Sequence, residues 1–125
     1  MRLTQEDVSC YLKDIKAAIK EKRYEVSVRA KNEQLFTDYV FTEKKREDIL
    51  LSLDVDDFSE AVNNQHPKFA DEVLYIFGKN VALLPRFGGK EVLVPLYIKF
   101  NLLKSKNCIV ISFHQQEHPL KYAFK

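Results

Sequence analysis

The chain has 125 residues, of which 46% are hydrophobic and 30% are charged. This balance excludes disordered and fibrous proteins, and the length excludes a core plus a separate cofactor domain. The formal net charge is only +2, but residues 51–75 carry six acidic and one basic side chain, whereas residues 76–125 carry eight basic and two acidic ones. A basic half suits a surface that meets phosphates, although lysines scattered over a solvated sheet give the same count.

The beginning of the chain predicts neither secretion nor membrane insertion. Residues 1–10 have no apolar signal-peptide core, and no apolar run approaches the roughly 18 residues of a membrane span. Cys10 and Cys108 lie far apart, without the paired spacing of a zinc ribbon or a redox motif, which favours free thiols. We therefore expect one domain over residues 1–125, in the cytoplasm and with no membrane partner.

The first half of the chain has helical periodicity. Thr4 precedes an acidic turn and can cap a first helix, whose apolar residues share one face: Val8, Tyr11, Leu12, Ile15, Ala18 and Ile19. Residues 24–30 alternate briefly and predict either a short edge strand or an extended link. Residues 31–53 predict one or two further helices, with Thr42 as the cap between them, and Asp54 can cap another short turn.

From residue 72 onward the period becomes that of strands. We predict strands over residues 72–79, 90–103 and 107–114, separated by Gly88-Gly89 and by the turn at residues 104–106. Helices followed by consecutive strands indicate an α+β fold, with N-terminal helices packed on one face of a C-terminal antiparallel sheet. Pro95 suggests that its strand lacks a partner there or is bulged.

The register of the last two strands follows from their apolar faces. Even positions 92–102 are apolar, and on the next strand the apolar set is Ile109, Ile111 and Phe113, so an odd residue must face an even one. The predicted core pairs are Leu102–Ile109, Phe100–Ile111 and Ile98–Phe113. The same register places polar pairs on the other face, away from the helices: Lys99–Ser112 and Tyr97–His114.

His114 is the main candidate for chemistry. An unperturbed imidazole titrates at about pH 6.5, so it can take up or release a proton at physiological pH. The alternative is a histidine that ends a strand and hydrogen-bonds the tail. Pro119 keeps His118 extended, so the tail can fold over the sheet and bring Lys121 and Tyr122 toward His114. The tail can equally serve in packing, through Leu120, Tyr122 and Phe124.

Other chemistries have less support in the sequence. A zinc site would need His114, His118 and a third ligand from His66, a cysteine or an acid, and no second ligand pair is visible. There is no glycine-rich phosphate loop and no nucleophile elbow. We therefore predict no metal and no cofactor.

A tyrosine, a lysine and a histidine on one face can cleave RNA without a metal. One group removes the proton of the ribose 2′-OH, a cation stabilises the phosphate under attack, and another group protonates the leaving 5′-oxygen. We predict His114 as base or acid, Lys99 as the charge stabiliser and Tyr97 as a hydrogen-bonding partner. The need for a 2′-OH makes RNA, and not DNA, the substrate.

Three short motifs carry a family resemblance: "YIKF" at residues 97–100, "IVISF" followed by His114, and "LSLDVDDF" at residues 51–58. With the order of helices and strands, the chain resembles the motility quorum-sensing regulator (MqsR) toxins of the RelE-like group. The resemblance implies a type II toxin that cleaves mRNA, free or on the ribosome, inhibits growth, and is neutralised by a cognate antitoxin protein.

The resemblance assigns catalysis to Tyr97, Lys99 and His114, and we expect Arg86, His118, Lys121 and Tyr122 to contact RNA. A family lysine falls on Glu60, which is acidic, and the family's glutamine before the sheet has no clear match. These departures leave room for a second hypothesis, a non-catalytic module that holds a protein partner on the polar sheet and on acidic residues 54–72.

Overall fold

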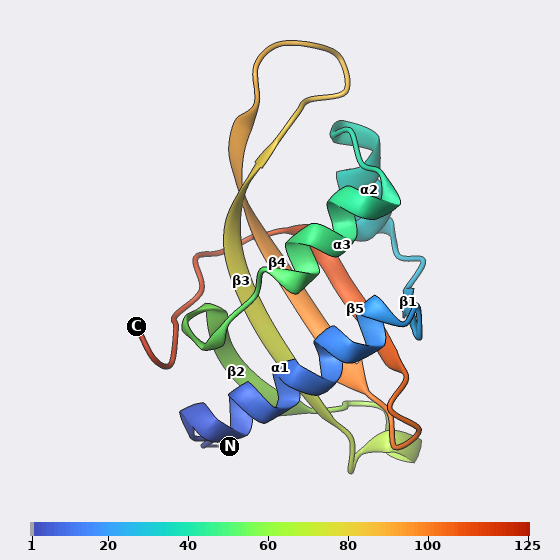
Figure 1. The fold of residues 1–125 in the computed structure, drawn as a ribbon, viewed down its shortest axis with the longest axis vertical. Helices are drawn as coiled ribbons and strands as arrows, with labels where there is room; N and C mark the ends of the chain where they lie inside the picture. The colour runs from blue at the N-terminus through green and yellow to red at the C-terminus, as the bar shows by residue number, and fades with distance from the viewer. Residues whose placement is uncertain (1) are drawn as a thin grey trace.

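The computed structural model describes residues 2–125 and has an α+β fold (Figure 1). Three α-helices occur: α1 (Gln5–Lys20), α2 (Ala30–Asp38) and α3 (Glu43–Leu51). Five strands form one sheet: β1 (Tyr24–Val26), β2 (Phe58–Asn63), β3 (Val73–Leu83), β4 (Val92–Leu102) and β5 (Cys108–Gln115). Two 3-10 turns, η1 (Val55–Asp57) and η2 (Pro67–Phe69), flank β2.

The sheet has the strand order β1-β5-β4-β3-β2. Strand β1 pairs parallel with β5, and every other neighbouring pair is antiparallel. Helices α1 and α3 lie across one face of the sheet, and α2 packs beside β5 (Figure 1). The predicted class, N-terminal helices packed on one face of an antiparallel sheet, is confirmed, and the parallel edge strand β1 is the one departure from it. The other face of β4 and β5 is left for polar side chains.

Helix α1 begins as the sequence predicts. The Thr4 hydroxyl accepts a hydrogen bond from the Asp7 N–H at 3.1 Å, and the Asp7 carboxylate accepts one from the Thr4 N–H at 2.9 Å. The buried residues of the helix are five of the six in the predicted stripe: Val8, Leu12, Ile15, Ala18 and Ile19. The sixth, Tyr11, is partly buried. Thr42 caps α3 by accepting from the Lys45 N–H, and Asp54 caps η1, so both predicted caps are confirmed.

The core lies between the helices and the sheet. Three phenylalanines from successive strands, Phe77, Phe100 and Phe113, are fully buried in it. On β4 the residues Leu96, Ile98 and Phe100 are likewise fully buried, so their neighbours Tyr97 and Lys99 must point to the opposite face. The alternation that the sequence predicts for this strand is confirmed.

The hairpin of β4 and β5 corrects part of the predicted register. Near the turn, Phe100 pairs with Val110 and Leu102 with Cys108, and not with Ile111 and Ile109. The turn holds three residues, 104–106, closed by a hydrogen bond from the Leu103 N–H to the Asn107 carbonyl at 2.9 Å. Such a loop shifts the pairing by one residue relative to a two-residue loop. Lys106 takes the left-handed conformation that it requires, with φ of 70°.

A β-bulge restores the predicted register farther along the same hairpin. The pairing shifts between Phe100 and Lys99, so that Ile111 is the extra residue of β5. Beyond it, Lys99 pairs with Ser112 and Ile98 with Phe113, as predicted. Cys108 and Val110 therefore belong to the core cluster, in place of the predicted Ile109 and Ile111.

Strand β2 is an element that the sequence analysis did not predict. It pairs antiparallel with the first half of β3, with a bulge between Phe58 and Glu60. Of residues 24–30, only Tyr24–Val26 form a strand, the short edge strand β1, which is the first of the two predicted alternatives. Pro95 pairs with Asn80 on β3, but on its other side it lies beyond the end of β5, whose last pair is Leu96–Gln115. The proline thus has a partner strand on one side only.

The hairpin of β3 and β4 projects past the helices as an arm, residues 81–94 (Figure 1). Most of the large exposed apolar residues of residues 2–125 lie on it: Leu84, Phe87, Val92 and Leu93. Within residues 2–125, no helix is both long enough and apolar enough to cross a membrane.

Candidate functional site

The outward face of the β4–β5 hairpin carries the predicted polar cluster. Tyr97 lies opposite His114, and Lys99 lies opposite Ser112. The phenol and imidazole rings stack, with their centroids 5.0 Å apart and their planes inclined by 11°. The predicted arrangement of these four residues is confirmed, because it depends only on the half of the hairpin beyond the bulge.

The imidazole of His114 has a defined tautomer. Its Nδ1 lies 2.9 Å from the carbonyl oxygen of Gln115. A carbonyl only accepts hydrogen bonds, so Nδ1 carries the proton in this contact, and Nε2 of a neutral ring keeps its lone pair. Nε2 is then the atom of His114 that can accept a proton or donate one to a bound molecule.

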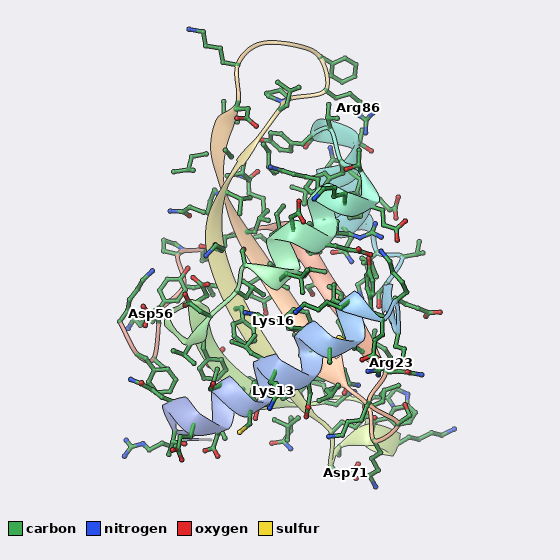
Figure 2. All side chains as sticks on the ribbon, viewed as in Figure 1. Lys13, Lys16, Arg23, Asp56, Asp71 and Arg86 are labelled. Carbon is green, nitrogen blue, oxygen red and sulfur yellow. The ribbon has the colours of Figure 1, made fainter. Side chains whose placement is uncertain are left out.

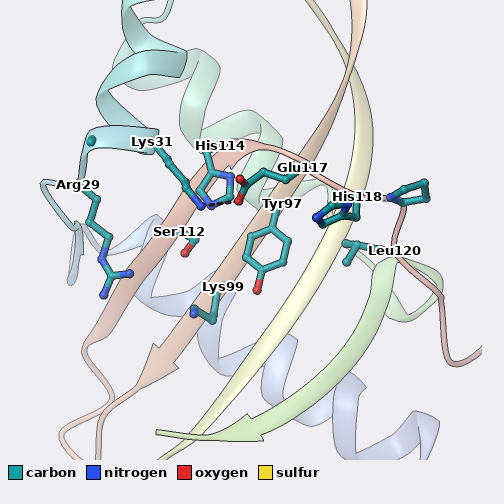
Figure 3. A pocket seen from close by; sticks show the side chains of 11 residues that line it. Arg29, Lys31, Tyr97, Lys99, Ser112, His114, Glu117, His118 and Leu120 are labelled. Carbon is teal, nitrogen blue, oxygen red and sulfur yellow. Dashed lines mark hydrogen bonds and ion pairs between the residues drawn. The ribbon is translucent and has the colours of Figure 1, made fainter. Parts of the chain in front are cut away.

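These side chains form the floor of a pocket of about 530 Å³ (Figure 3). Its walls come from two segments far apart in the sequence, the beginning of α2 and the tail after β5. The residues that line it are Arg29, Ala30, Lys31, Tyr97, Lys99, Ser112, His114, Glu117, His118, Pro119 and Leu120. Two imidazoles and three basic side chains (Arg29, Lys31 and Lys99) therefore line one depression, together with a single carboxylate.

Asn32 holds α2 against β5. Its carboxamide oxygen accepts a hydrogen bond from the Phe113 N–H at 2.8 Å, and its nitrogen donates to the carbonyls of Ile111 at 3.1 Å and Ser27 at 2.9 Å. Asn32 is fully buried, so these bonds are shielded from water. They fix the first turn of α2 beside the pocket and so place Arg29 and Lys31 there.

The tail forms the opposite wall, and it is attached along its length. The Gln116 N–H donates to the Pro95 carbonyl at 2.8 Å, and its carboxamide donates to the Leu96 carbonyl at 3.0 Å. Farther on, the Ser59 hydroxyl donates to the Lys121 carbonyl at 2.7 Å. The tail therefore lies across the outward face of the sheet, from β4 to β2.

Gly78 on β3 allows the tail to lie close to the sheet. A Cβ atom at this position would lie 2.5 Å from the Tyr122 hydroxyl and 2.6 Å from Leu120 Cδ1. Both distances are shorter than a van der Waals contact, so only a glycine leaves the space that these side chains occupy. Leu120 in turn lines the pocket.

The electrostatics of the pocket favour an anion. Burial, and then the positive charges of Arg29 and Lys31, lower the pKa of Lys99 below its ordinary value. Three cations that repel one another at one place are stabilised when a negative charge binds among them. Burial and the charge of Glu60 raise the pKa of Tyr97, so the phenol keeps its proton at neutral pH.

Four of the predicted site residues line the pocket: Tyr97, Lys99, His114 and His118. Lys121 and Tyr122 lie farther along the tail; the Tyr122 hydroxyl is 3.5 Å from the Gln116 carboxamide, over Gly78. Arg86 is on the arm (Figure 2). Its guanidinium donates to carbonyls at the end of α2, including that of Thr37 at 3.0 Å. These bonds occupy the guanidinium in capping α2, which is a structural role.

The sequence analysis missed Arg29, Lys31, Ser112 as a pocket residue, and Glu117. Arg29 and Lys31 carry no signal of their own, because only the long-range bonds of Asn32 bring them to the pocket. Within residues 2–125, no group of three or more histidine, cysteine, aspartate or glutamate residues has an arrangement that could hold a metal ion.

Comparisons with protein-family models, with curated proteins and with solved structures found no match to this chain. The structure itself shows an α+β protein with a basic, histidine-containing pocket on the sheet face opposite α1 and α3. The resemblance to the MqsR toxins stays a prediction from the sequence.

Proposed function

We propose that the protein is an endoribonuclease that cleaves mRNA in this pocket without a metal, and that it acts as the toxin of a type II toxin-antitoxin pair. The observation that carries the proposal is the convergence of Arg29, Lys31 and Lys99 around His114. Cations bind the phosphodiester, and an imidazole beside them moves protons. The toxin role and the antitoxin partner rest on the sequence resemblance alone.

The chemistry follows from the placement of the two imidazoles. His114 Nε2 takes the proton of the ribose 2′-OH, and the 2′-oxygen attacks the adjacent phosphorus. The bond from phosphorus to the 5′-oxygen breaks, and a protonated His118 supplies the proton that the 5′-oxygen takes up. The products are a 2′,3′-cyclic phosphate and a free 5′-hydroxyl. Lys99 lies half-buried at the floor, where it can stabilise the charge on the phosphate oxygens.

Tyr97 supports His114 in this scheme. The stacked phenol ring restricts rotation of the imidazole, and so favours a fixed orientation of His114 in the pocket that it lines. Its hydroxyl remains protonated at neutral pH and can donate a hydrogen bond to a phosphate oxygen. The phenol thus acts by orientation and hydrogen bonding, not by proton abstraction.

Cleavage of labelled single-stranded RNA in EDTA tests the proposal. We expect a cyclic phosphate product from RNA and none from DNA of the same sequence, because DNA lacks the 2′-OH. His114→Ala should lower the rate by about 10²–10⁴-fold, and Lys99→Ala by about 10²–10³-fold. Lys104→Ala, in the exposed turn between β4 and β5, is the matched control and should leave the rate unchanged.

Ribosome-bound mRNA should be tested beside free RNA, because the resemblance to the MqsR and RelE-like toxins implies cleavage of mRNA that is free or on the ribosome. Full activity and full toxicity of both His114→Ala and Lys99→Ala would refute the mechanism. In cells, expression should arrest growth, and co-expression of an adjacent small gene should relieve the arrest.

A second candidate function is the non-catalytic protein-binding module. It is favoured by the exposed apolar residues of the arm, of which Phe87 is 90% exposed and Leu93 69%. Exposed acidic residues would add charge recognition, among them Glu60 on β2 and Asp56 just before it. Harmless expression, with no cleavage of RNA in any form, would favour this function over the toxin.

A further inference from the structure

The pocket is divided from a smaller one by an ion pair. The smaller pocket, of about 150 Å³, is lined by Lys31, Gln34, Leu35, Asp38, His114, Gln115 and Glu117. Lys31, His114 and Glu117 line both pockets. The Lys31 ammonium and the Glu117 carboxylate form a salt bridge beside the imidazole, between α2 and the tail (Figure 3).

Glu117 is the only acidic residue of the larger pocket. Its carboxylate binds Lys31, one of the three cations that would otherwise face a bound anion. The Lys31 hydrogen bond, and more weakly the nearby His114 and His118, lower the pKa of Glu117 and keep it ionised. A carboxylate offers two charged oxygen acceptors, as a phosphodiester does, so both suit the same lysine.

The ion pair is easily exchanged. The side chains of Lys31 and Glu117 are 60% and 59% exposed, and pairs so open to solvent contribute little to stability. The adjacent Gln116 is held to β4 by the hydrogen bonds of its N–H and its carboxamide. Glu117 can therefore leave Lys31 by rotation of its side chain, without release of the tail.

We propose that Glu117 is an internal competitor of the substrate phosphate, and that an entering phosphodiester takes its place on Lys31. Displacement of the carboxylate joins the two pockets into one groove past His114. The smaller pocket then receives the neighbouring nucleotide, whose base meets the carboxamides of Gln34 and Gln115. Gln34 is already oriented by its hydrogen bond to Asp38 at 2.9 Å. This inference rests on the proposed binding of RNA.

The test measures binding of a fluorescent 2′-O-methyl hexanucleotide, which lacks the 2′-OH and is not cleaved. Glu117→Gln should bind it about two- to fivefold more tightly than the wild type at low salt, the range of an exposed ion pair. Asp14→Asn is the control, because Asp14 pairs with Lys106 at 3.1 Å outside both pockets and the change in net charge is the same. It should alter affinity by less than about 1.5-fold.

A double-mutant cycle shows whether Glu117 acts through Lys31. In the Lys31→Gln background, Glu117→Gln should no longer increase affinity. An equal gain in that background, or in Asp14→Asn, would overturn the inference, since it would reduce the effect to overall charge. Weaker binding by a fully folded Glu117→Gln would also overturn it.

The two proposals fail in different ways. If the wild type binds the hexanucleotide and Glu117→Gln binds it no better, the competitor is refuted and the RNA site stands. If neither the wild type nor any variant binds the hexanucleotide, and neither cleaves free or ribosome-bound RNA, the proposed function itself is refuted, and the inference with it.

Discussion

Asn32 on α2 gives Phe113 on β5 the hydrogen-bond partner that a neighbouring strand would otherwise supply. Its carboxamide oxygen accepts from the Phe113 N–H at 2.8 Å, and its nitrogen donates to the Ile111 carbonyl. Strand β1 pairs only with Cys108–Val110, so the edge of β5 beyond it would be unpaired. One buried side chain thus extends the sheet and anchors the helix that forms a wall of the pocket.

Asn32→Ala should destabilise the protein by about 2–4 kcal/mol, because it leaves buried backbone groups on β5 without partners. Urea denaturation measures the change in the free energy of unfolding. Gln34→Ala, on the exposed side of the same helix, should cost about 0.5 kcal/mol or less. A loss below about 1 kcal/mol in Asn32→Ala would mean that water replaces the carboxamide.

Gly78→Ala should displace the tail from the sheet. The new methyl group would lie 2.5 Å from the Tyr122 hydroxyl, and we expect a loss of about 1–2 kcal/mol. Tyr122→Phe removes that hydroxyl, so the double variant should lose less than the sum of the two single losses. Strict additivity in thermal unfolding would contradict the close approach.

Lys99→Met should stabilise the protein while it removes binding of RNA. Lys99 is half-buried near Arg29 and Lys31, and its lowered pKa means that its charge opposes folding at neutral pH. The gain should reach at most about 1 kcal/mol, because solvent screens a half-exposed charge. Lys104→Met, in the exposed turn, is the control. A destabilised Lys99→Met would show that the lysine has a structural role.

The pH dependence of stability reports the same group. A lysine whose pKa is lower in the folded than in the unfolded state destabilises the protein while it is charged. This cost is complete at pH values below the folded pKa and is absent at pH values above the unfolded pKa. Stability should therefore gain a contribution as pH rises from the lowered pKa to the ordinary value near 10.5. The contribution should be missing in Lys99→Met when the two unfolding curves are compared across that range.

The two cysteines should differ in reactivity. Cys108 is 1% exposed, and burial raises the pKa of its thiol to about 12, whereas Cys10 is exposed on α1. A thiol reagent reacts with the thiolate, so the native protein should consume one equivalent rapidly and a second only after unfolding. Rapid reaction of two equivalents in the native state would place Cys108 at the surface.

The sequence predicts the elements whose periodicity is regular. Helix α1 has an apolar stripe and a capping box, and Leu96, Ile98 and Phe100 alternate strictly along β4. Strand β2 was missed because its buried residues, Phe58 and Ala61, are three positions apart. The bulge after Phe58 breaks the alternation by which a strand is recognised.

The candidate site also has a part that the sequence predicts and a part that it does not. Tyr97, Lys99 and His114 follow from the pairing of two adjacent strands, which alternation determines. Arg29 and Lys31 do not, because the place of α2 depends on hydrogen bonds between residues far apart in the sequence. The turn-end pairs were predicted one residue out of register, because a three-residue loop with a left-handed Lys106 leaves no clear sequence signal.

The extra residue Ile111 affects the pairing of β4 with β5 and the attachment of α2 to β5 in different ways. Deleting it would remove the bulge and still leave Lys99 opposite Ser112 and Tyr97 opposite His114, since regular pairing from Val110 leads to the same partners. It would, however, take away the carbonyl to which Asn32 donates. A single-codon deletion would thus keep the histidine and the lysine in position and weaken the attachment of the helix that brings Arg29 and Lys31 to them.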